Sequence, residues 1–264
     1  MLWSGSMSDR RVVVVTGASQ GIGRELAVAF AAAGDTVVLA ARNKEGLEAT
    51  AEAVSASGGD PFVAPADVTD PSGVEAMAGL VLDRYGRVDA LVNNSGVGGP
   101  SGRMWEIDPE EWMGTFAVNV FGVFLVSRAF LPKMIEQRAG SVINIGSVTG
   151  KRPLYGRSAY TATKSALIGL TRTLALEAGP FGVRANLLSP GFVAGPRFEW
   201  LVSAQMAARG VTEEVVKTEL VGNAALRRLT EARDVADAAV FLASDAARAI
   251  TGVDLNVNSG IIMY

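Results

Sequence analysis

Tyr160 and Lys164 have the types and the spacing of a proton-transfer pair. They are four residues apart in the segment SAYTATKSALIGL, so on a helix both side chains lie on one face. A phenol with a pKa of about 10 is a poor base near neutral pH, and a fixed ammonium group close by lowers that pKa. The pair predicts a lysine-assisted tyrosine acid/base, although two amphipathic side chains on an ordinary packed helix would have the same spacing.

Ser147 and Asn119 are the other two candidates for this chemistry. Ser147 ends a predicted strand, at the edge where open α/β sheets bind ligands, and its hydroxyl can hydrogen-bond a substrate carbonyl. Taken alone, it would be an ordinary turn serine. Asn119 lies in the apolar helical segment FAVNVFG, where a buried amide needs hydrogen-bond partners. With Tyr160 and Lys164 they form the most economical acid/base set that the sequence offers.

The composition restricts the available chemistry further. The 264 residues include no histidine and no cysteine, so proton transfer near neutral pH has to use a carboxylate, a lysine or a tyrosine, and imidazole or thiolate metal sites are excluded. The net charge of -3 provides no basic field for nucleic acid or for an anionic membrane surface. We therefore expect a small-molecule substrate, no metal and no nucleic-acid partner.

Short β-branched runs alternate with helical stretches along the chain. Near-continuous apolar strands separated by helices predict a doubly wound parallel sheet, covered on both faces. The predicted strands cover residues 11–17, 35–41, 60–66, 88–94, 140–147, 182–189 and 252–258. The predicted helices cover residues 22–33, 44–57, 71–85, 109–136, 159–178 and 232–243.

The gaps between these elements leave no room for an interdomain linker. We expect residues 10–264 to form a single domain and residues 1–9 to be an N-terminal extension. Residues 192–228 form an insertion with its own helical periodicity, between the last two predicted strands. It could add packing only, but its position after the carboxyl end of a strand favours a helical substrate lid.

The first predicted strand runs into TGASQGIG, a glycine-rich turn that opens a helix. Gly17, Gly21 and Gly23 let the backbone approach a pyrophosphate closely, and the N–H groups at the helix N-terminus attract its charge. Tight strand-to-helix turns often need glycine for their own geometry. Placed after the first strand of a βαβ unit, however, the pattern predicts a dinucleotide site.

Over residues 10 to 260 the chain resembles the classical short-chain dehydrogenases/reductases (SDR). The resemblance rests on the order and spacing of TGASQGIG (16–23), ADVTD (66–70), NNSG (93–96), VNV around Asn119, IGS ending at Ser147, YTATK (160–164) and SPG (189–191). It implies a Rossmann-type fold of the α/β class, with about seven strands in a single NAD(P)-binding domain. It also implies an oxidoreductase that interconverts a secondary alcohol and a ketone by hydride transfer.

The resemblance assigns a role to each matching residue. Tyr160 would exchange the proton with the substrate oxygen, Lys164 would also hold the nicotinamide ribose, and Asn119 would position a water in a proton relay. Asp67 would accept from the adenine amino group, with Val68 packed on that ring. The complete set implied to bind the cofactor is Gly17, Ser19, Gln20, Gly21, Ile22, Gly23, Arg42, Asn43, Asp67, Val68, Asn94, Gly96, Tyr160, Lys164, Pro190, Gly191 and Val193.

The end of the second predicted strand favours NADP(H) over NAD(H). Sites for NAD usually carry a carboxylate there to accept the ribose hydroxyls, whereas this chain has Ala41 and then Arg42. A guanidinium can hold a 2′-phosphate, with Asn43 as a helper. The alternative, with NAD(H) as the cofactor, is that Arg42 is only a solvated arginine at the start of a helix.

The expected substrate is a small polyol, sugar or hydroxy/keto compound. The alternative is a 3-oxoacyl-thioester (acyl-carrier-protein) reductase, but such members carry an arginine where this chain has Leu176. Arg152 and Arg157 are near the site in sequence and could attract an anionic group, although we expect both to be solvated. The remaining alternative is a dinucleotide-binding protein without catalysis, which the complete acid/base set disfavours.

The expected pocket wall is mainly apolar. It comprises residues 97–104, Val148, Thr149, Leu154, Tyr155, Phe192, Phe198, Trp200 and Met206.

The resemblance also implies a homotetramer, built by the helices at 109–136 and 159–178. Both are long, apolar and rich in small residues, which permits close packing. The N-terminal residues lack the pattern of a signal peptide, and no apolar run is expected to reach membrane-spanning length. We therefore expect a cytoplasmic protein.

Overall fold

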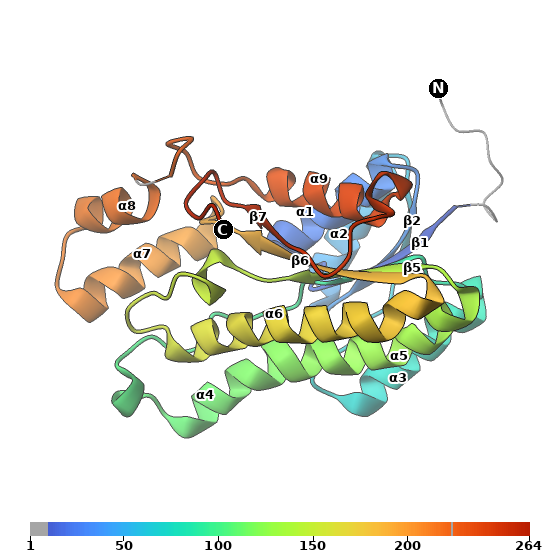
Figure 1. Cartoon of the computed structure of the whole chain (residues 1–264), viewed down its shortest axis with the longest axis horizontal. Coiled ribbons are helices and arrows are strands. Elements are labelled where there is room, and N and C mark those ends of the chain that lie inside the picture. The colour runs from blue at the N-terminus through green and yellow to red at the C-terminus, as the bar shows by residue number, and fades with distance from the viewer. Residues whose placement is uncertain (1–9, 223) are drawn as a thin grey trace.

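In the computed structural model, which describes residues 10–222 and 224–264, seven parallel strands form one sheet in the order β3-β2-β1-β4-β5-β6-β7 (Figure 1). The predicted extension at residues 1–9 lies outside the described residues. The strands are β1 (Val12–Thr16), β2 (Thr36–Ala40), β3 (Asp60–Val63), β4 (Ala90–Asn93), β5 (Gly140–Ile145), β6 (Val183–Pro190) and β7 (Asp254–Val257). The predicted doubly wound sheet is confirmed.

Helices cover both faces of this sheet. The helices are α1 (Gly21–Ala32), α2 (Lys44–Ala56), α3 (Pro71–Tyr85), α4 (Pro109–Phe116), α5 (Gly122–Gln137), α6 (Ser158–Ala178), α7 (Pro196–Arg209), α8 (Glu213–Val221) and α9 (Ala232–Ala243). Helices α1, α2 and α9 lie on one face, and α3, α5 and α6 lie on the other (Figure 1). Because the helices cover its two faces, the sheet is left open at the two ends of its strands.

The four valines of β1 show how an apolar strand supports two cores at once. Val13 and Val15 pack into the core under α1 and α9, whereas Val12 and Val14 pack into the core under α3 and α5. Successive side chains of a strand point to opposite faces, so a strand buried on both sides has to be apolar throughout. The same rule explains the apolar runs in the other central strands.

The strand order reverses between β1 and β4. The chain moves outward from β1 through β2 to β3 and then returns to pair β4 with the other side of β1. At such a reversal, the connections after neighbouring strands leave in opposite directions and open a crevice at the carboxyl ends. The fold therefore provides a ligand crevice beside the glycine-rich turn.

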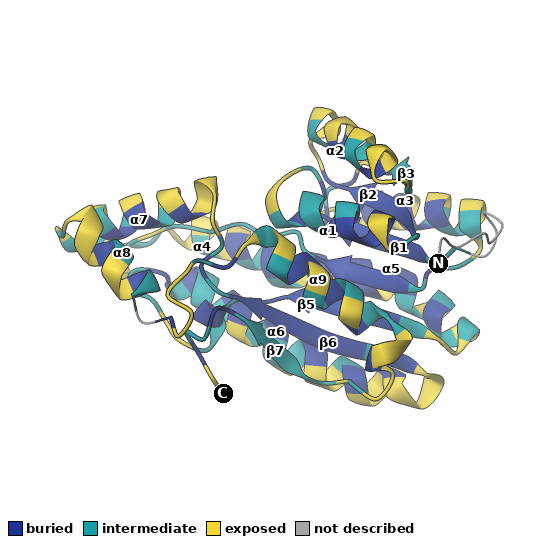
Figure 2. Cartoon of the chain, turned by 90° about the horizontal axis from the view of Figure 1, so that it is seen from above, coloured by how far each residue is buried: buried dark blue, intermediate teal, exposed yellow. Residues whose placement is uncertain are grey.

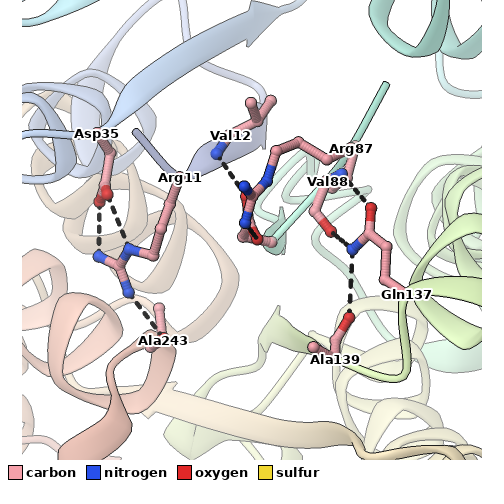
Figure 3. Close-up of polar contacts among 9 residues, drawn as sticks. Arg11, Val12, Asp35, Arg87, Val88, Gln137, Ala139 and Ala243 are labelled. Carbon is pink, nitrogen blue, oxygen red and sulfur yellow. Dashed lines mark hydrogen bonds and ion pairs between the residues drawn. The ribbon is translucent and has the colours of Figure 1, made fainter. Parts of the chain in front are cut away.

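A polar cluster ties the strands together at the opposite, amino ends (Figure 3). Arg11 holds the buried Asp35 through two hydrogen bonds of 2.8 Å and donates to the carbonyl of Ala243. Asp89 accepts from the backbone N–H of Val12, which joins the starts of β1 and β4. Because these contacts lie away from the carboxyl ends, they support the fold without entering the crevice.

Residues 109–137 form one long helix rather than the uniform α-helix expected for 109–136. A π-helical segment at Ala117–Phe121 separates α4 from α5. The helix is long and apolar enough to cross a membrane by length and composition, so the expectation that no run reaches that length is wrong. In the structure Val126, Phe130 and Met134 are buried against the sheet, as in the core helix of a folded domain.

The insertion predicted at 192–228 contains α7 and α8, which stand beyond the carboxyl ends of the strands (Figure 2). Its buried side chains form a separate apolar cluster of Phe192, Phe198, Val202, Val216 and Leu220. Gln205 of α7 is buried and donates to the backbone carbonyl of Tyr155, which ties the insertion to the loop before α6. The insertion therefore has its own packing and is attached to the domain beside the crevice.

Candidate active site

A cavity of about 790 Å³ opens at the carboxyl ends of the strands. It extends from the glycine-rich turn before α1 to the first turn of α7. The residues predicted for catalysis or cofactor binding that line it are Gly17, Ser19, Gln20, Gly21, Ile22, Gly23, Arg42, Asn43, Asp67, Val68, Asn94, Gly96, Ser147, Tyr160, Lys164, Pro190, Gly191 and Val193. Asn119 is the predicted site residue that lies behind this lining.

The glycine-rich turn has the conformation that the sequence predicted for it. Gly17 and Gly21 have φ values of 66° and 55°, in the left-handed region that favours glycine. A Cβ on Gly23 would overlap the carbonyl oxygen of Gly17, so only glycine allows α1 to begin this close to β1. The side-chain amide of Asn94 donates to the carbonyls of Thr16 and Gly17 and fixes the turn from the neighbouring strand β4.

Thr16 is a part of this turn that the sequence analysis missed. Its hydroxyl accepts from the backbone N–H groups of Asn94 and Ser95, each at 3.0 Å. These bonds join the carboxyl ends of β1 and β4 at the point where the strand order reverses. A buried threonine at the end of a valine run was the only sequence signal for this contact.

Arg42 and Asp67 meet at the other end of the cavity. Their side chains form an exposed ion pair at 3.6 Å. The backbone N–H of Thr69 lowers the pKa of Asp67 against a smaller opposing effect of burial, with further lowering by the Thr69 hydroxyl and by Arg42. The side-chain oxygen of Asn43 accepts from the backbone N–H of Gly46 and caps α2. Asn43 therefore has a structural task in addition to its place in the lining.

Tyr160 and Lys164 lie one turn apart on α6, as their spacing predicted. Lys164 is buried, and its Nζ donates to the backbone carbonyl of Ile145 at 2.7 Å and lies 5.7 Å from the centre of the Tyr160 ring. Burial raises the pKa of Tyr160, but Lys164, Arg197, a hydrogen bond with Ser147 and Arg157 together lower it below its ordinary value of 10.0. The net effect favours the phenolate.

The pKa of Lys164 is lowered as well. Burial is its largest cause, the charge of Tyr160 opposes it, and Arg197 adds to the lowering. Tyr160 and Lys164 each appear among the charges that act on the other, so the two groups are electrostatically linked. The arrangement concentrates exchangeable protons on one face of α6.

Asn119 holds the backbone beside this pair from within the π-helical segment. Its side chain accepts from the N–H of Val97 at 2.8 Å and donates to the carbonyl of Val97 and to the hydroxyl of Thr163. Thr163 in turn donates to the carbonyl of Tyr160. Both amide hydrogens of Asn119 are thus engaged in joining α6 to the loop after β4, and one lone pair on its oxygen is left for a further donor.

The sequence analysis did not single out Arg197, and it favoured a solvated position for Arg157. Arg157, which we expected to be solvated, is only 3% exposed and donates to the carbonyls of Gly98, Gly99 and Pro100. Arg197, from the first turn of α7, lies with its guanidinium carbon 5.5 Å from the centre of the Tyr160 ring. Arg157 is three residues before Tyr160, whereas Arg197 is far from it in sequence, and only the packing of α7 over the cavity brings Arg197 to Tyr160. The expectation for Arg152 is confirmed, because its side chain is exposed.

The family of this chain follows from a comparison with models of known protein families. The model of the family described as short chain dehydrogenase matches residues 11–206. The chain belongs to this family. As a short chain dehydrogenase it is an oxidoreductase that acts on a CH–OH group with NAD(P).

Individual relatives support the same assignment over nearly the whole chain. The 3-oxoacyl-[acyl-carrier-protein] reductase FabG of Staphylococcus aureus is 35% identical over 97% of this chain and 100% of its own. Among solved structures, NAD+-bound xylitol dehydrogenase has a TM-score of 0.92 at 28% identity, covering 97% of this chain and 100% of its own. A variant of actinorhodin polyketide ketoreductase with NADPH has a TM-score of 0.91 at 31% identity, covering 98% and 100%.

The substrate end of this short chain dehydrogenase differs in part from the expected apolar wall. Of the expected residues, Val97, Thr149, Leu154, Phe192, Phe198 and Trp200 do line the cavity. Val148, Tyr155 and Met206 do not, and Met104 is 70% exposed. Met104 begins a short 3-10 helix, Met104–Glu106, after the loop that follows β4. Arg157 and Arg197 replace part of the expected apolar surface with charge.

Among the residues that the structure describes, no group of three or more acidic side chains could hold a metal ion.

Proposed function

We propose that this dehydrogenase interconverts a secondary alcohol and a ketone, with Tyr160 as the general acid/base and NADP(H) as the favoured cofactor. The observation that supports this best is the Tyr160–Lys164 pair on α6, in which the buried Lys164 is fixed by Ile145 and the pKa of Tyr160 is lowered at the wall of the cavity. A phenol whose pKa lies nearer to neutral exchanges protons more readily at physiological pH. This pair is the best-supported acid/base group in the site.

The cavity fits a dinucleotide. The positive φ values of Gly17 and Gly21 and the absence of a Cβ at Gly23 create room at the N-terminus of α1, where backbone N–H groups attract a diphosphate. The cavity continues past Asp67 and Val68 at one end and reaches Tyr160 at the other. The order of these lining groups fits an adenosine site, a diphosphate site and a nicotinamide site.

Each side chain near Tyr160 has a defined task in this proposal. A bound nicotinamide supplies the hydride in reduction and accepts it in oxidation. Ser147 donates a hydrogen bond to the substrate carbonyl oxygen, and Tyr160 gives that oxygen the proton that completes the alcohol. In oxidation the Tyr160 phenolate takes the same proton back, and the Lys164 charge stabilises the phenolate. Asn119 positions the backbone around the pair and helps hold a relay water.

Arg42 supports the preference for NADP(H). It stands at the end of β2, where a carboxylate would repel a 2′-phosphate, and its side chain is 72% exposed and lines the cavity. Its ion pair with Asp67 is long and solvated, so a phosphate can compete for the guanidinium at little cost. Replacing Arg42 by aspartate should reverse the ratio of kcat/KM for NADPH and NADH. An unchanged ratio would contradict the assignment of the NADP(H) preference to Arg42.

A small hydroxy or keto compound, polyol or sugar is the proposed substrate class. Reduction of a 3-oxoacyl thioester on a carrier protein remains the second candidate, because the Staphylococcus aureus reductase is 35% identical over its full length. Leu176 weighs against an acidic carrier protein, since it is 80% exposed and presents an apolar surface where a basic one would attract the carrier.

A substrate panel tests the proposal. Absorbance of the reduced nicotinamide should be followed with NADPH and NADH against small ketones, sugars and acetoacetyl thioesters, free and carried on acyl-carrier protein. We expect turnover of small ketones with NADPH. Preference for the carrier-bound thioester by orders of magnitude would favour the second candidate, and cofactor binding without any turnover would contradict catalysis.

We further propose a cytoplasmic homotetramer that binds neither nucleic acid nor membrane. The net charge of -3 supports the absence of a nucleic-acid role. Exposed aromatic side chains on the long helix, Phe121 at 45% and Phe124 at 48%, support an interface there.

A further inference from the structure

The charge at the catalytic end of the cavity is more positive than hydride transfer requires. In the part of the chain that the structure describes, the cationic side chains that line this end are Arg157, Lys164 and Arg197. The described lining contains one carboxylate, that of Asp67, and it belongs to the adenosine end, where it pairs with Arg42. A chain with a net charge of -3 thus concentrates positive charge around Tyr160.

Arg157 is the fixed member of this group. Its guanidinium is buried, is held by the carbonyls of residues 98–100, and lies 4.8 Å from the ring of Trp200 and 5.2 Å from that of Tyr160. No carboxylate of residues 10–222 or 224–264 lies within ion-pair distance of it. Backbone carbonyls compensate the burial of this guanidinium, but they do not neutralise its charge, so its positive field acts on the cavity.

Arg197 is the accessible member. It lines the cavity from the exposed first turn of α7, and its hydrogen bond to the carbonyl of Gly96 is long at 3.5 Å. The same guanidinium lowers the pKa values of both Tyr160 and Lys164. Its fork of N–H donors can therefore turn to an oxyanion beside the reacting carbonyl while its charge acts on the acid/base pair.

We propose that Arg197, with Arg157 behind it, binds an oxyanion of the substrate, so that the natural substrate is a ketone or alcohol that carries a carboxylate or a phosphate close to the reacting carbon. This rests on the proposed function, because it assigns the substrate of the same site. Trp200 packs against Arg157 and lines the same cavity, so α7 contributes both Arg197 and Trp200 to the wall beside the oxyanion.

The cofactor diphosphate is the other oxyanion that could reach an arginine in this cavity. Its place at the N-terminus of α1, among Gly17, Gly21 and Gly23, follows from the room and the N–H groups there. Arg197 instead lies against the ring of Tyr160, where the substrate carbonyl is expected. The geometry therefore favours the substrate as the source of the charge, and the two sources are separable by experiment.

The test uses the full chain and two matched pairs of ketones. The pairs are acetoacetate with its methyl ester, and dihydroxyacetone phosphate with dihydroxyacetone, each reduced with NADPH. The wild type should favour the charged member of at least one pair in kcat/KM. Arg197→Gln should lower that preference about tenfold to a hundredfold, because a charge-assisted hydrogen bond is lost, and Arg197→Lys should retain part of it.

Two controls separate this inference from its alternatives. Arg152→Gln removes an exposed arginine outside the lining and should leave the preference unchanged. Fluorescence titration should show an unchanged Kd for NADPH in Arg197→Gln; a loss of affinity that matches the loss of activity would assign Arg197 to the cofactor and overturn the inference.

The remaining outcomes are equally decisive. The wild type could turn over both neutral ketones as well as or better than the charged ones, or its preference could survive Arg197→Gln. Either result would overturn the inference that Arg197 binds a substrate oxyanion and would leave the proposed function intact. Failure to reduce any ketone or thioester, with NADPH bound, would overturn the proposed function and the inference that rests on it.

Discussion

At the scale of single residues, cations set the acidity of Tyr160. Burial alone would raise the pKa of this phenol, and the opposing effects of Lys164, Arg197, Ser147 and Arg157 bring it below 10.0. Because histidine is absent from the chain, no imidazole can take over this proton transfer. We therefore expect the pH dependence of turnover to be set by Tyr160 and Lys164 on α6 and by the charges around them.

Removing the lysine charge should move this pH dependence upward. In alcohol oxidation the phenolate is the base, so kcat/KM should rise as the pH rises through the pKa of Tyr160. Lys164→Met removes the largest of the effects that lower this pKa, so the rise should shift to higher pH and the rate at neutral pH should fall. The measurement is kcat/KM for oxidation against pH; an unshifted profile would show that Lys164 does not tune the tyrosine.

Sequence alone could predict the pair but not the charge around it. Tyr160 and Lys164 are linked by helical periodicity, and Ser147 by its place at a strand end. Arg197 is far from Tyr160 in the chain, and its approach depends on how α7 folds over the crevice. The prediction that Arg157 is solvated was wrong, because three backbone carbonyls of the loop after β4, rather than an acidic side chain, stabilise its buried guanidinium.

At the scale of elements, close packing of α1 on β1 shapes the cofactor site. Gly23→Ala should destabilise the protein by about 1–3 kcal/mol and weaken NADPH binding, because the added methyl overlaps the Gly17 carbonyl and pushes the turn outward. Gly79→Ala is the matched control in α3, where nothing lies within 4 Å of an added Cβ. Urea unfolding should show that variant to be as stable as the wild type or slightly more so. Equal behaviour of the two variants would contradict the packing argument.

Arg11 supports the opposite ends of the strands through a nearly buried carboxylate. Burial raises the pKa of Asp35, and the hydrogen bonds and charge of Arg11 oppose that rise. Arg11→Met removes the opposition, so the folded-state pKa rises further and the charged carboxylate becomes harder to accommodate. We expect the free energy of unfolding to fall by about 2 kcal/mol near neutral pH. This is less than for a fully buried ion pair, because Arg11 is one-third exposed.

The sign of the pH dependence of the Arg11→Met effect follows from the raised pKa of Asp35. A carboxyl group with a folded pKa above the unfolded value favours folding when protonated, and this advantage is lost as the pH rises from the ordinary value of 3.8 through the folded pKa. The deficit of Arg11→Met in urea unfolding should therefore grow from acidic to neutral pH. Arg233→Met, which breaks the exposed pair with Asp237, is the control and should cost below about 0.5 kcal/mol.

Most elements could be predicted within a residue or two because their apolar periodicity is strong. The helix starting at Pro71 and the helix over 232–243 begin and end where the sequence placed them. Strand β3 ends at Val63 and is shorter than the predicted 60–66, although the backbone N–H of Ala66 still donates to the carbonyl of Ala41. The π-helical segment around Asn119 was not predictable from periodicity, because one extra residue in a turn leaves almost no trace in an apolar run.

At the scale of the whole molecule, the surface left by the fold predicts self-association. Phe121 and Phe124 are stacked and nearly half exposed on the long helix, whose other side is buried in the core. Multi-angle light scattering should give the mass of a tetramer of 27.5 kDa chains, and Phe124→Glu should reduce it by placing charge in the interface. A monomeric wild type would contradict the proposed assembly.

The central claim is that Tyr160 transfers the proton in a site whose cofactor binding does not depend on its hydroxyl. The most direct measurement is turnover and NADPH affinity of Tyr160→Phe with the best ketone of the panel. We predict that kcat falls by about a hundredfold to ten-thousandfold, as for loss of a general acid, while the Kd for NADPH changes little. Retention of kcat within a few-fold of the wild type would contradict the account.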